Sequence, residues 1–110
     1  MAHYFESNDL NKFSTINEEV PEYWDAFLGY YGKVFEEGSL TTREKTLIGL
    51  AVAMAEKCPY CIDQYTQNCL NVGITEEQMT EVMHVTSAMK AGANLVQGVQ
   101  IKNIVKKLEF

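Results

Sequence analysis

The sequence contains few residues that interrupt a helix. It has only two prolines and seven glycines among 110 residues. No stretch shows the alternation of apolar and polar residues between turn residues that is typical of a β-strand. No run approaches the ~18 apolar residues of a membrane span, and the first residues lack the charged and then apolar order of a signal peptide. We therefore expect an all-α, cytoplasmic protein that does not bind membranes.

Positive charge is also scarce, because nine Lys and Arg residues face fifteen Asp and Glu residues, which gives a formal net charge of −6. The negative electrostatic field of such a protein repels phosphate backbones, so we expect no nucleic-acid partner. The three cysteines are an odd number, and paired structural disulfides would leave one thiol over. This count favours redox or metal chemistry. The length and the 46% hydrophobic content indicate one globular domain over residues 1–110, with residues 1–14 as a polar N-terminal arm.

Apolar residues at helical spacing predict a bundle of five or six helices. We expect the first to present a core face and the second to be central and buried. The last carries apolar residues on two faces, so it either kinks near Gly98 or is buried on both sides by a second subunit. The expected helices are Thr15 or Pro21 to Glu37, stopped by Gly38; Lys45 to Lys57, opened by a capping box at Thr41–Glu44; Tyr60 to Asn71, ending near Gly73; a helix from a second capping box at Thr75–Gln78 to Ala91–Gly92; and Asn94 to Leu108.

The most informative string is Cys58-Pro59-Tyr60-Cys61. Pro59 suits the first turn of a helix, so the two cysteines lie at a helix start. Sulfurs three residues apart meet on one side of a helix and can form and break a disulfide with little backbone movement. The amide groups and dipole at a helix N-terminus also lower a thiol pKa. This pattern is typical of redox machinery.

Two other interpretations of the pair remain open. It could be half of a zinc site with Cys69 and His84 as further ligands, or two buried thiols that act as small apolar residues. Cys69 lies about two helical turns, ~12 Å, from Cys61, which a tetrahedral metal does not span. The sequence therefore favours redox chemistry, with Cys69 as a buried small residue and His84 on a solvated face.

The residues also resemble a known family. The strings are Arg43 to Ala53 (REKTLIGLAVA), Cys58 to Ile62 (CPYCI) and Gly73 to Gln78 (GITEEQ). In this order and spacing they are similar to the carboxymuconolactone decarboxylase-like superfamily. The CxxC pair favours its alkylhydroperoxidase D (AhpD)-like branch over the decarboxylase branch, which lacks it.

This resemblance implies a helical domain that forms homo-trimers or hexamers. It would reduce hydrogen peroxide or small organic peroxides and be reduced again by a dithiol protein of the thioredoxin-like or lipoyl type. Cys61 would attack the peroxide and Cys58 would resolve the sulfenic acid into a disulfide. The resemblance implies no metal, flavin or haem.

Two positions depart from the family pattern of a His and a Glu that relay protons to the thiol. Tyr65 and Thr46 stand there and would act as hydrogen-bonding neighbours, since a tyrosine with a pKa near ~10 is a poor base at neutral pH. A Tyr also follows the pair in a peroxidase-like subgroup associated with arsenosugar biosynthesis, which this string resembles. The alternative function is a non-catalytic binding or redox-sensing oligomer that kept the fold and lost the relay.

Overall fold

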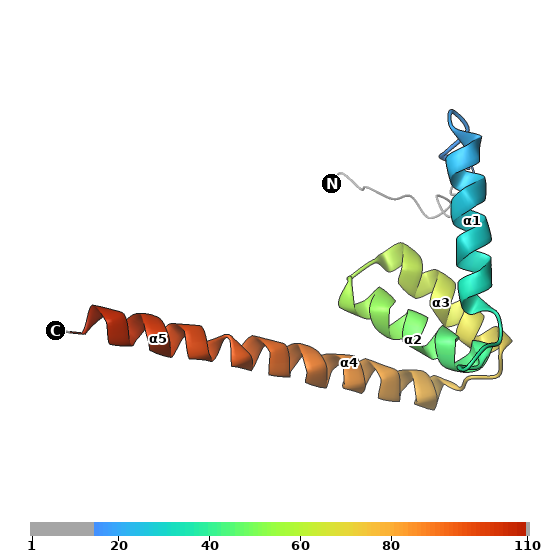
Figure 1. The fold of residues 1–110 in the computed structure, drawn as a ribbon. Helices are drawn as coiled ribbons and strands as arrows, with labels where there is room; N and C mark the ends of the chain where they lie inside the picture. The colour runs from blue at the N-terminus through green and yellow to red at the C-terminus, as the bar shows by residue number, and fades with distance from the viewer. Residues whose placement is uncertain (1–14, 110) are drawn as a thin grey trace, which may run out of the picture. The chain divides into compact units, whose positions relative to one another are not determined.

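The computed structural model describes residues 15–109, and within them the chain is helical with no strand (Figure 1). The expected arm, residues 1–14, lies outside the described residues. The chain divides into two units between Thr42 and Arg43, and each is described by itself. The predicted all-α class is confirmed, whereas the prediction of one domain stays a prediction. The helices are α1 (Pro21–Phe35), α2 (Thr42–Ala55), α3 (Pro59–Asn71), α4 (Glu76–Val96) and α5 (Gly98–Leu108).

Helix α1, in the first unit, carries a ladder of aromatic rings along one face. Ring centroids are 5.9 Å apart for Trp24 and Phe27, 5.6 Å for Phe27 and Tyr31, and 5.0 Å for Tyr31 and Phe35. Within its own unit no residue of α1 is buried and Phe27 is 45% exposed, so the prediction that this face is core stays a prediction. These contacts between neighbouring turns stabilise the helix locally.

The end of α1 also differs from the prediction of Glu37 and Gly38. The helix stops at Phe35, because Glu36 takes an extended conformation. The Thr42 hydroxyl then donates to the Phe35 carbonyl at 2.8 Å, which satisfies one of the carbonyls left open at a helix end. A side-chain cap from seven residues further along the chain therefore replaces the expected glycine stop.

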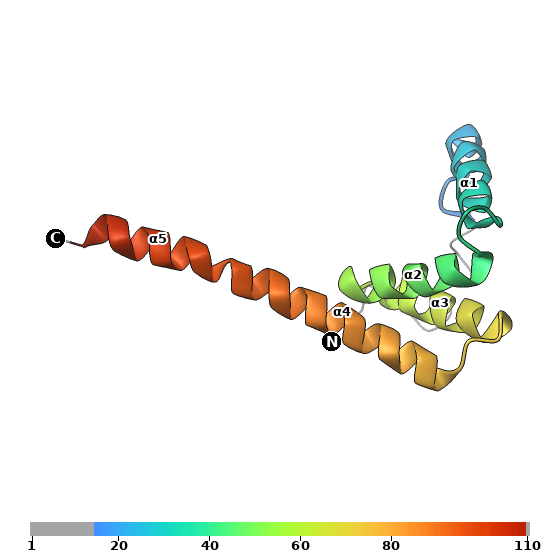
Figure 2. The ribbon, with the colours of Figure 1, turned by 60° about the horizontal axis from the view of Figure 1, so that its bottom comes forward.

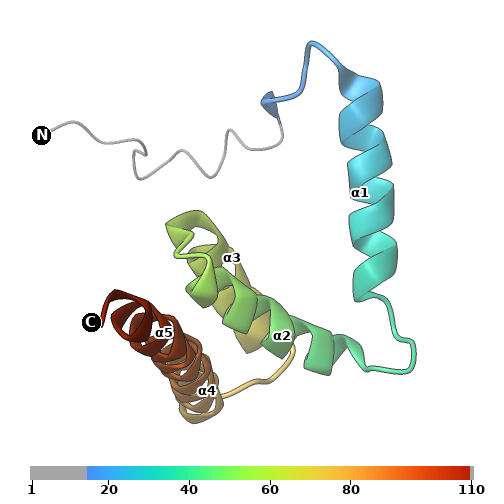
Figure 3. The same ribbon diagram turned by 60° about the vertical axis from the view of Figure 1, so that its left-hand side comes forward.

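Helices α2, α3 and α4 of the second unit lie side by side (Figures 2 and 3). Helix α2 is buried only along the side that α3 and α4 cover, so Ile48 and Val52 remain 51% and 54% exposed. Within this unit α2 is therefore not buried around most of its circumference, and the prediction for the whole chain stays a prediction. The buried residues of this unit are Thr46, Leu50, Ala53, Tyr65, Cys69, Ile74 and Thr86.

The two predicted starts around α3 and α4 are close to the observed ones. Pro59 is the first residue of α3, and Gly73 ends the following turn with φ +80°. The capping box is present at the start of α4, where the Gln78 amide donates to Thr75 Oγ1 at 3.1 Å and the Thr75 amide donates to Gln78 Oε1 at 2.9 Å. Local sequence signals therefore determine these starts.

The break between the last two helices lies later than predicted. Gly92 is inside α4, which continues to Val96, because a glycine costs a helix only ~1 kcal/mol and no turn follows it. The helix is interrupted at Gln97, next to the predicted kink at Gly98. Helix α5 then continues in nearly the direction of α4 (Figure 1). Within the described residues, α5 has no buried residue. The helices described here include none with the length and hydropathy that crossing a membrane requires.

Candidate active site

The turn from α2 to α3 places the cysteine pair. Lys57 adopts a left-handed conformation with φ 54°, which glycine usually supplies after a helix. Its amide donates to the Met54 carbonyl at 3.1 Å, and the Cys58 amide donates to the Ala53 carbonyl at 3.2 Å. This is the Schellman pattern of a helix C-terminus. It ends α2 and delivers Cys58 directly to the start of α3.

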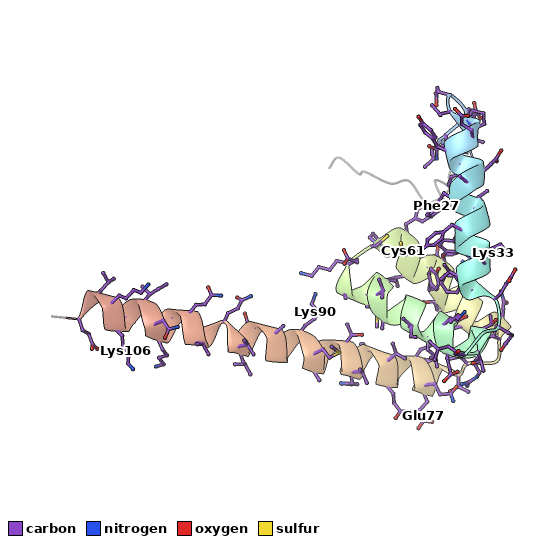
Figure 4. The ribbon with its side chains drawn as sticks, in the orientation of Figure 1. Phe27, Lys33, Cys61, Glu77, Lys90 and Lys106 are labelled. Atoms are coloured by element: carbon purple, nitrogen blue, oxygen red, sulfur yellow. The ribbon has the colours of Figure 1, made fainter. Side chains whose placement is uncertain are left out.

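Cys58 is the N-cap residue of α3. Its backbone is extended, with φ −99° and ψ 99°, and its Sγ accepts a hydrogen bond from the Cys61 amide at 3.2 Å. Pro59 occupies the first helical position, where the missing N–H costs nothing. Both cysteines are free thiols and partly buried, and Figure 4 labels Cys61 in the first turn of α3. The predicted placement of the pair at a helix start is confirmed.

The two thiols are electrostatically unequal. The pKa of Cys61 is raised from 9.0 to about 11, first by the hydrogen bond of its side chain with Cys58, then by burial and by the charge on Cys58. The expectation that the helix start lowers a thiol pKa is therefore wrong for Cys61. Its own amide hydrogen bond acts in the opposite direction but is the weaker effect. Cys61 therefore holds its proton more tightly than an ordinary thiol.

Tyr65 and Thr46 lie in the packed interface between α3 and α2. Tyr65 stands one turn after Cys61 on α3 and is only 9% exposed, while Thr46 on α2 is 4% exposed. The Tyr65 ring lies against Gly49, so close that a Cβ added at Gly49 would be 2.7 Å from the ring carbon Cδ1. The absence of a side chain at Gly49 makes the place for Tyr65. Sequence reasoning missed Gly49, although a lone glycine inside an apolar helical run signals close packing.

Cys69 and His84 occupy the positions expected of them. Cys69 is completely buried, and its Sγ–H donates to the Thr46 carbonyl at 3.9 Å. Burial raises the pKa of the Cys69 thiol, and the positive charge of Arg43 opposes this. His84 is exposed on α4. Across residues 15–109, His, Cys, Asp and Glu form no cluster of three or more that could hold a metal, so the zinc alternative lacks a ligand set there.

Lys90, a residue that the sequence analysis did not single out, contacts the C-terminal end of α2, just before the turn to α3. The Lys90 ammonium group on α4 donates to the Ala55 carbonyl at 3.0 Å (Figure 4). Ala55 is the last residue of α2, where a positive charge complements the helix dipole. Beside this contact, α2 and α4 form an open groove of about 380 Å³. Its lining is almost entirely apolar and consists of Ala51, Val52, Ala55, Val85, Thr86, Met89, Lys90 and Ala93.

Comparison with known proteins places this chain among related sequences. The carboxymuconolactone decarboxylase family profile matches residues 21–101. An uncharacterised protein in the cox locus of Paracoccus denitrificans is 42% identical over 69 residues, 63% of this chain and 62% of that protein. An uncharacterised protein of Cupriavidus necator is 30% identical over 85 residues, 76% of this chain and 75% of that protein. The chain thus spans about three fifths of the Paracoccus relative.

Two crystal structures share the fold. A protein from Methanobacterium thermoautotrophicum superposes with a TM-score of 0.73 and 34% identity, covering 76% of this chain and 97% of that chain. A carboxymuconolactone decarboxylase family protein from Legionella pneumophila gives a TM-score of 0.67 and 26% identity, covering 72% of this chain and 70% of that chain. Fold and sequence therefore point to the same family.

Proposed function

The chain belongs to the carboxymuconolactone decarboxylase family, and from this premise we propose that it is a thiol-dependent oxidoreductase that reduces small peroxides. The observation that carries the proposal is the dithiol at the start of α3. Cys58 caps the helix, Cys61 follows in the same turn, and both thiols are partly exposed. The pair therefore needs little backbone movement to become a disulfide.

The proposed cycle transfers two electrons from the pair to the peroxide. One sulfur attacks the O–O bond, which releases an alcohol or water and leaves a sulfenic acid. The other sulfur displaces water from the sulfenic acid and forms the disulfide. A dithiol protein, thioredoxin-like or lipoyl-type, then reduces the disulfide and is itself oxidised. This cycle requires a reducing compartment such as the cytoplasm.

Intact-mass measurement tests the proposal. The reduced protein is treated briefly with one equivalent of an organic hydroperoxide, and we expect the loss of two hydrogens with formation of a Cys58–Cys61 disulfide. A Cys69→Ala variant is the matched control, because Cys69 is buried away from the pair and its loss should leave the reaction intact. A protein that stays reduced would refute the proposal and favour the alternative of a non-catalytic module that kept the fold.

We also propose that the functional species is a homo-oligomer. The apolar residues on one face of α5, which are Ile101, Ile104, Val105 and Leu108, are 51% to 65% exposed. The groove between α2 and α4 offers a second uncovered apolar surface. Single exposed apolar side chains are normal, but a continuous stripe of them is typical of an interface. In an assembly of identical chains, the α5 stripe of one copy would bind in the α2–α4 groove of another, so both apolar surfaces would be covered.

Sedimentation equilibrium tests this assembly. We expect Ile104→Glu, in the centre of the α5 stripe, to shift the protein toward monomer. Asn103→Glu adds the same charge on the opposite face of the same helix and should leave the assembly unchanged. A monomeric parent protein, or equal effects of the two substitutions, would argue against this interface.

A further inference from the structure

The two sulfurs of the pair occupy different positions in the first turn of α3. Cys58 precedes the helix, and its Sγ accepts the Cys61 amide proton at 3.2 Å. Cys61 lies within the helix, and the neighbouring Cys58 side chain is the largest cause of its raised pKa. Cys58 Sγ is thus the acceptor of a backbone donor, in the N-cap position where anionic atoms are stabilised by the helix terminus.

This difference in position favours Cys58 over Cys61 as the site of negative charge. Of the two sulfurs, Cys58 Sγ is the one that accepts the Cys61 amide proton, at 3.2 Å, and an N–H that points at a sulfur favours negative charge there. A thiolate, and not a thiol, is the nucleophile toward peroxides and disulfides. A proton on the Cys61 thiol would lie in the same helical turn as Cys58 Sγ.

The residues at the family relay positions, Thr46 and Tyr65, do not favour Cys61 over Cys58 as the attacking sulfur. Thr46 and Tyr65 are buried in the contact between α2 and α3, with the Tyr65 ring packed on Gly49. Neither is a base at neutral pH, since threonine does not titrate and tyrosine keeps its proton. Neither side chain therefore provides a base that would remove the Cys61 proton.

Resting on the proposed function, we propose that Cys58 is the sulfur that attacks the peroxide, and that Cys61 first protonates the departing oxygen and then closes the disulfide. The Cys58 thiolate gives an electron pair to one peroxide oxygen, so an S–O bond forms and the O–O bond breaks. The leaving alkoxide takes the proton of Cys61 and departs as an alcohol. The Cys61 thiolate then attacks the Cys58 sulfur, so the S–S bond forms, the S–O bond breaks and hydroxide leaves. The hydroxide takes up the proton that Cys58 gave to the solvent when it ionised, and the products are the disulfide, an alcohol and water. This order is the reverse of the one that the resemblance implies.

Trapping the sulfenic acid distinguishes the two orders. Cys61→Ser and Cys58→Ser are each treated with one equivalent of an organic hydroperoxide in the presence of dimedone, which labels sulfenic acids. We expect the label on Cys58 of Cys61→Ser to form at least ~10-fold faster than the label on Cys61 of Cys58→Ser. Far-UV circular dichroism checks that both variants keep the helical content of the parent. Faster labelling of Cys61, or equal rates, would overturn the proposed order.

The unsubstituted protein provides an independent measurement. With less than one equivalent of iodoacetamide, we expect the first label on Cys58, located by fragmentation of the peptide that begins after Lys57. A first label on Cys61 would overturn the order even if both serine variants were damaged. If the parent closes its disulfide with hydroperoxide but the labels show Cys61 reacting first, only the order fails. If the parent stays reduced, the proposed function fails and the order fails with it.

Discussion

The contact between Gly49 and Tyr65 predicts that one added methyl group destabilises the protein. In Gly49→Ala the new Cβ would lie 2.7 Å from Tyr65 Cδ1, well inside van der Waals contact. Tyr65 is only 9% exposed, so its ring has little room to withdraw. Overpacking of this kind costs ~1–3 kcal/mol, while alanine gains ~1 kcal/mol over glycine inside a helix. The net effect should range from neutral to a loss of ~2 kcal/mol.

Gly92→Ala is the matched control for this prediction. Gly92 also lies inside a helix, but a Cβ there meets nothing within 4 Å. Its substitution should therefore gain the full ~1 kcal/mol of helix propensity. The two variants should differ in unfolding free energy by ~1–3 kcal/mol, or at least ~4 °C in melting temperature for a domain of this size.

Urea and thermal unfolding, followed by circular dichroism at one fixed protein concentration, measure this difference. A Tyr65→Ala background completes the test, because without the ring the Gly49→Ala substitution should no longer be costly. If Gly49→Ala stabilises the protein as much as Gly92→Ala does, the reasoning that Tyr65 occupies the place of the missing side chain is refuted.

Three further predictions follow from the turns and the thiols. Lys57→Gly should stabilise the protein by ~1 kcal/mol in urea unfolding, because a left-handed conformation costs an L-residue ~1–2 kcal/mol; a loss of stability would contradict this. Thr75→Ala should destabilise α4 by ~1 kcal/mol through loss of the capping box, measured in the same way, and an unchanged midpoint would show that the cap contributes little. Because folding raises the pKa of Cys61 from 9.0 to about 11, its contribution to stability is complete below pH 9 and is lost between pH 9 and 11. The parent should therefore lose stability over this range more steeply than Cys61→Ser, and parallel pH profiles would contradict the raised pKa.

The local features of the fold could be predicted from the sequence because their causes are local. Pro59 marks the start of α3 and Thr75 with Gln78 marks the start of α4, since a cap depends on residues within one turn. The placement of Cys58 and Cys61 at a helix start followed from the same signals. The predicted end of α4 at Gly92 was wrong, because a glycine can lie inside a helix as well as at its end. The sequence alone does not distinguish the two cases.

The remaining features depend on contacts between residues far apart in the chain. Lys90 contacts Ala55, 35 residues away, and Gly49 meets Tyr65 across two helices. No periodicity in the sequence reports such pairs. The unequal thiols were missed for a related reason. A dipole argument treats the whole helix start alike, whereas the hydrogen bond and charge between the two sulfurs raise the pKa of Cys61 in particular.

Cys58 belongs to two helices at the same time, because its amide closes the end of α2 while its sulfur caps α3. A disulfide sulfur is a poorer hydrogen-bond acceptor than a thiolate, so oxidation weakens the cap of α3 and leaves the closure of α2 intact. In the proposed cycle, a change in the redox state of the pair would therefore alter one backbone hydrogen bond, that of the Cys61 amide. Hydrogen–deuterium exchange at Cys61 should be faster in the oxidised protein than in the reduced one, while exchange at Cys58 stays slow in both.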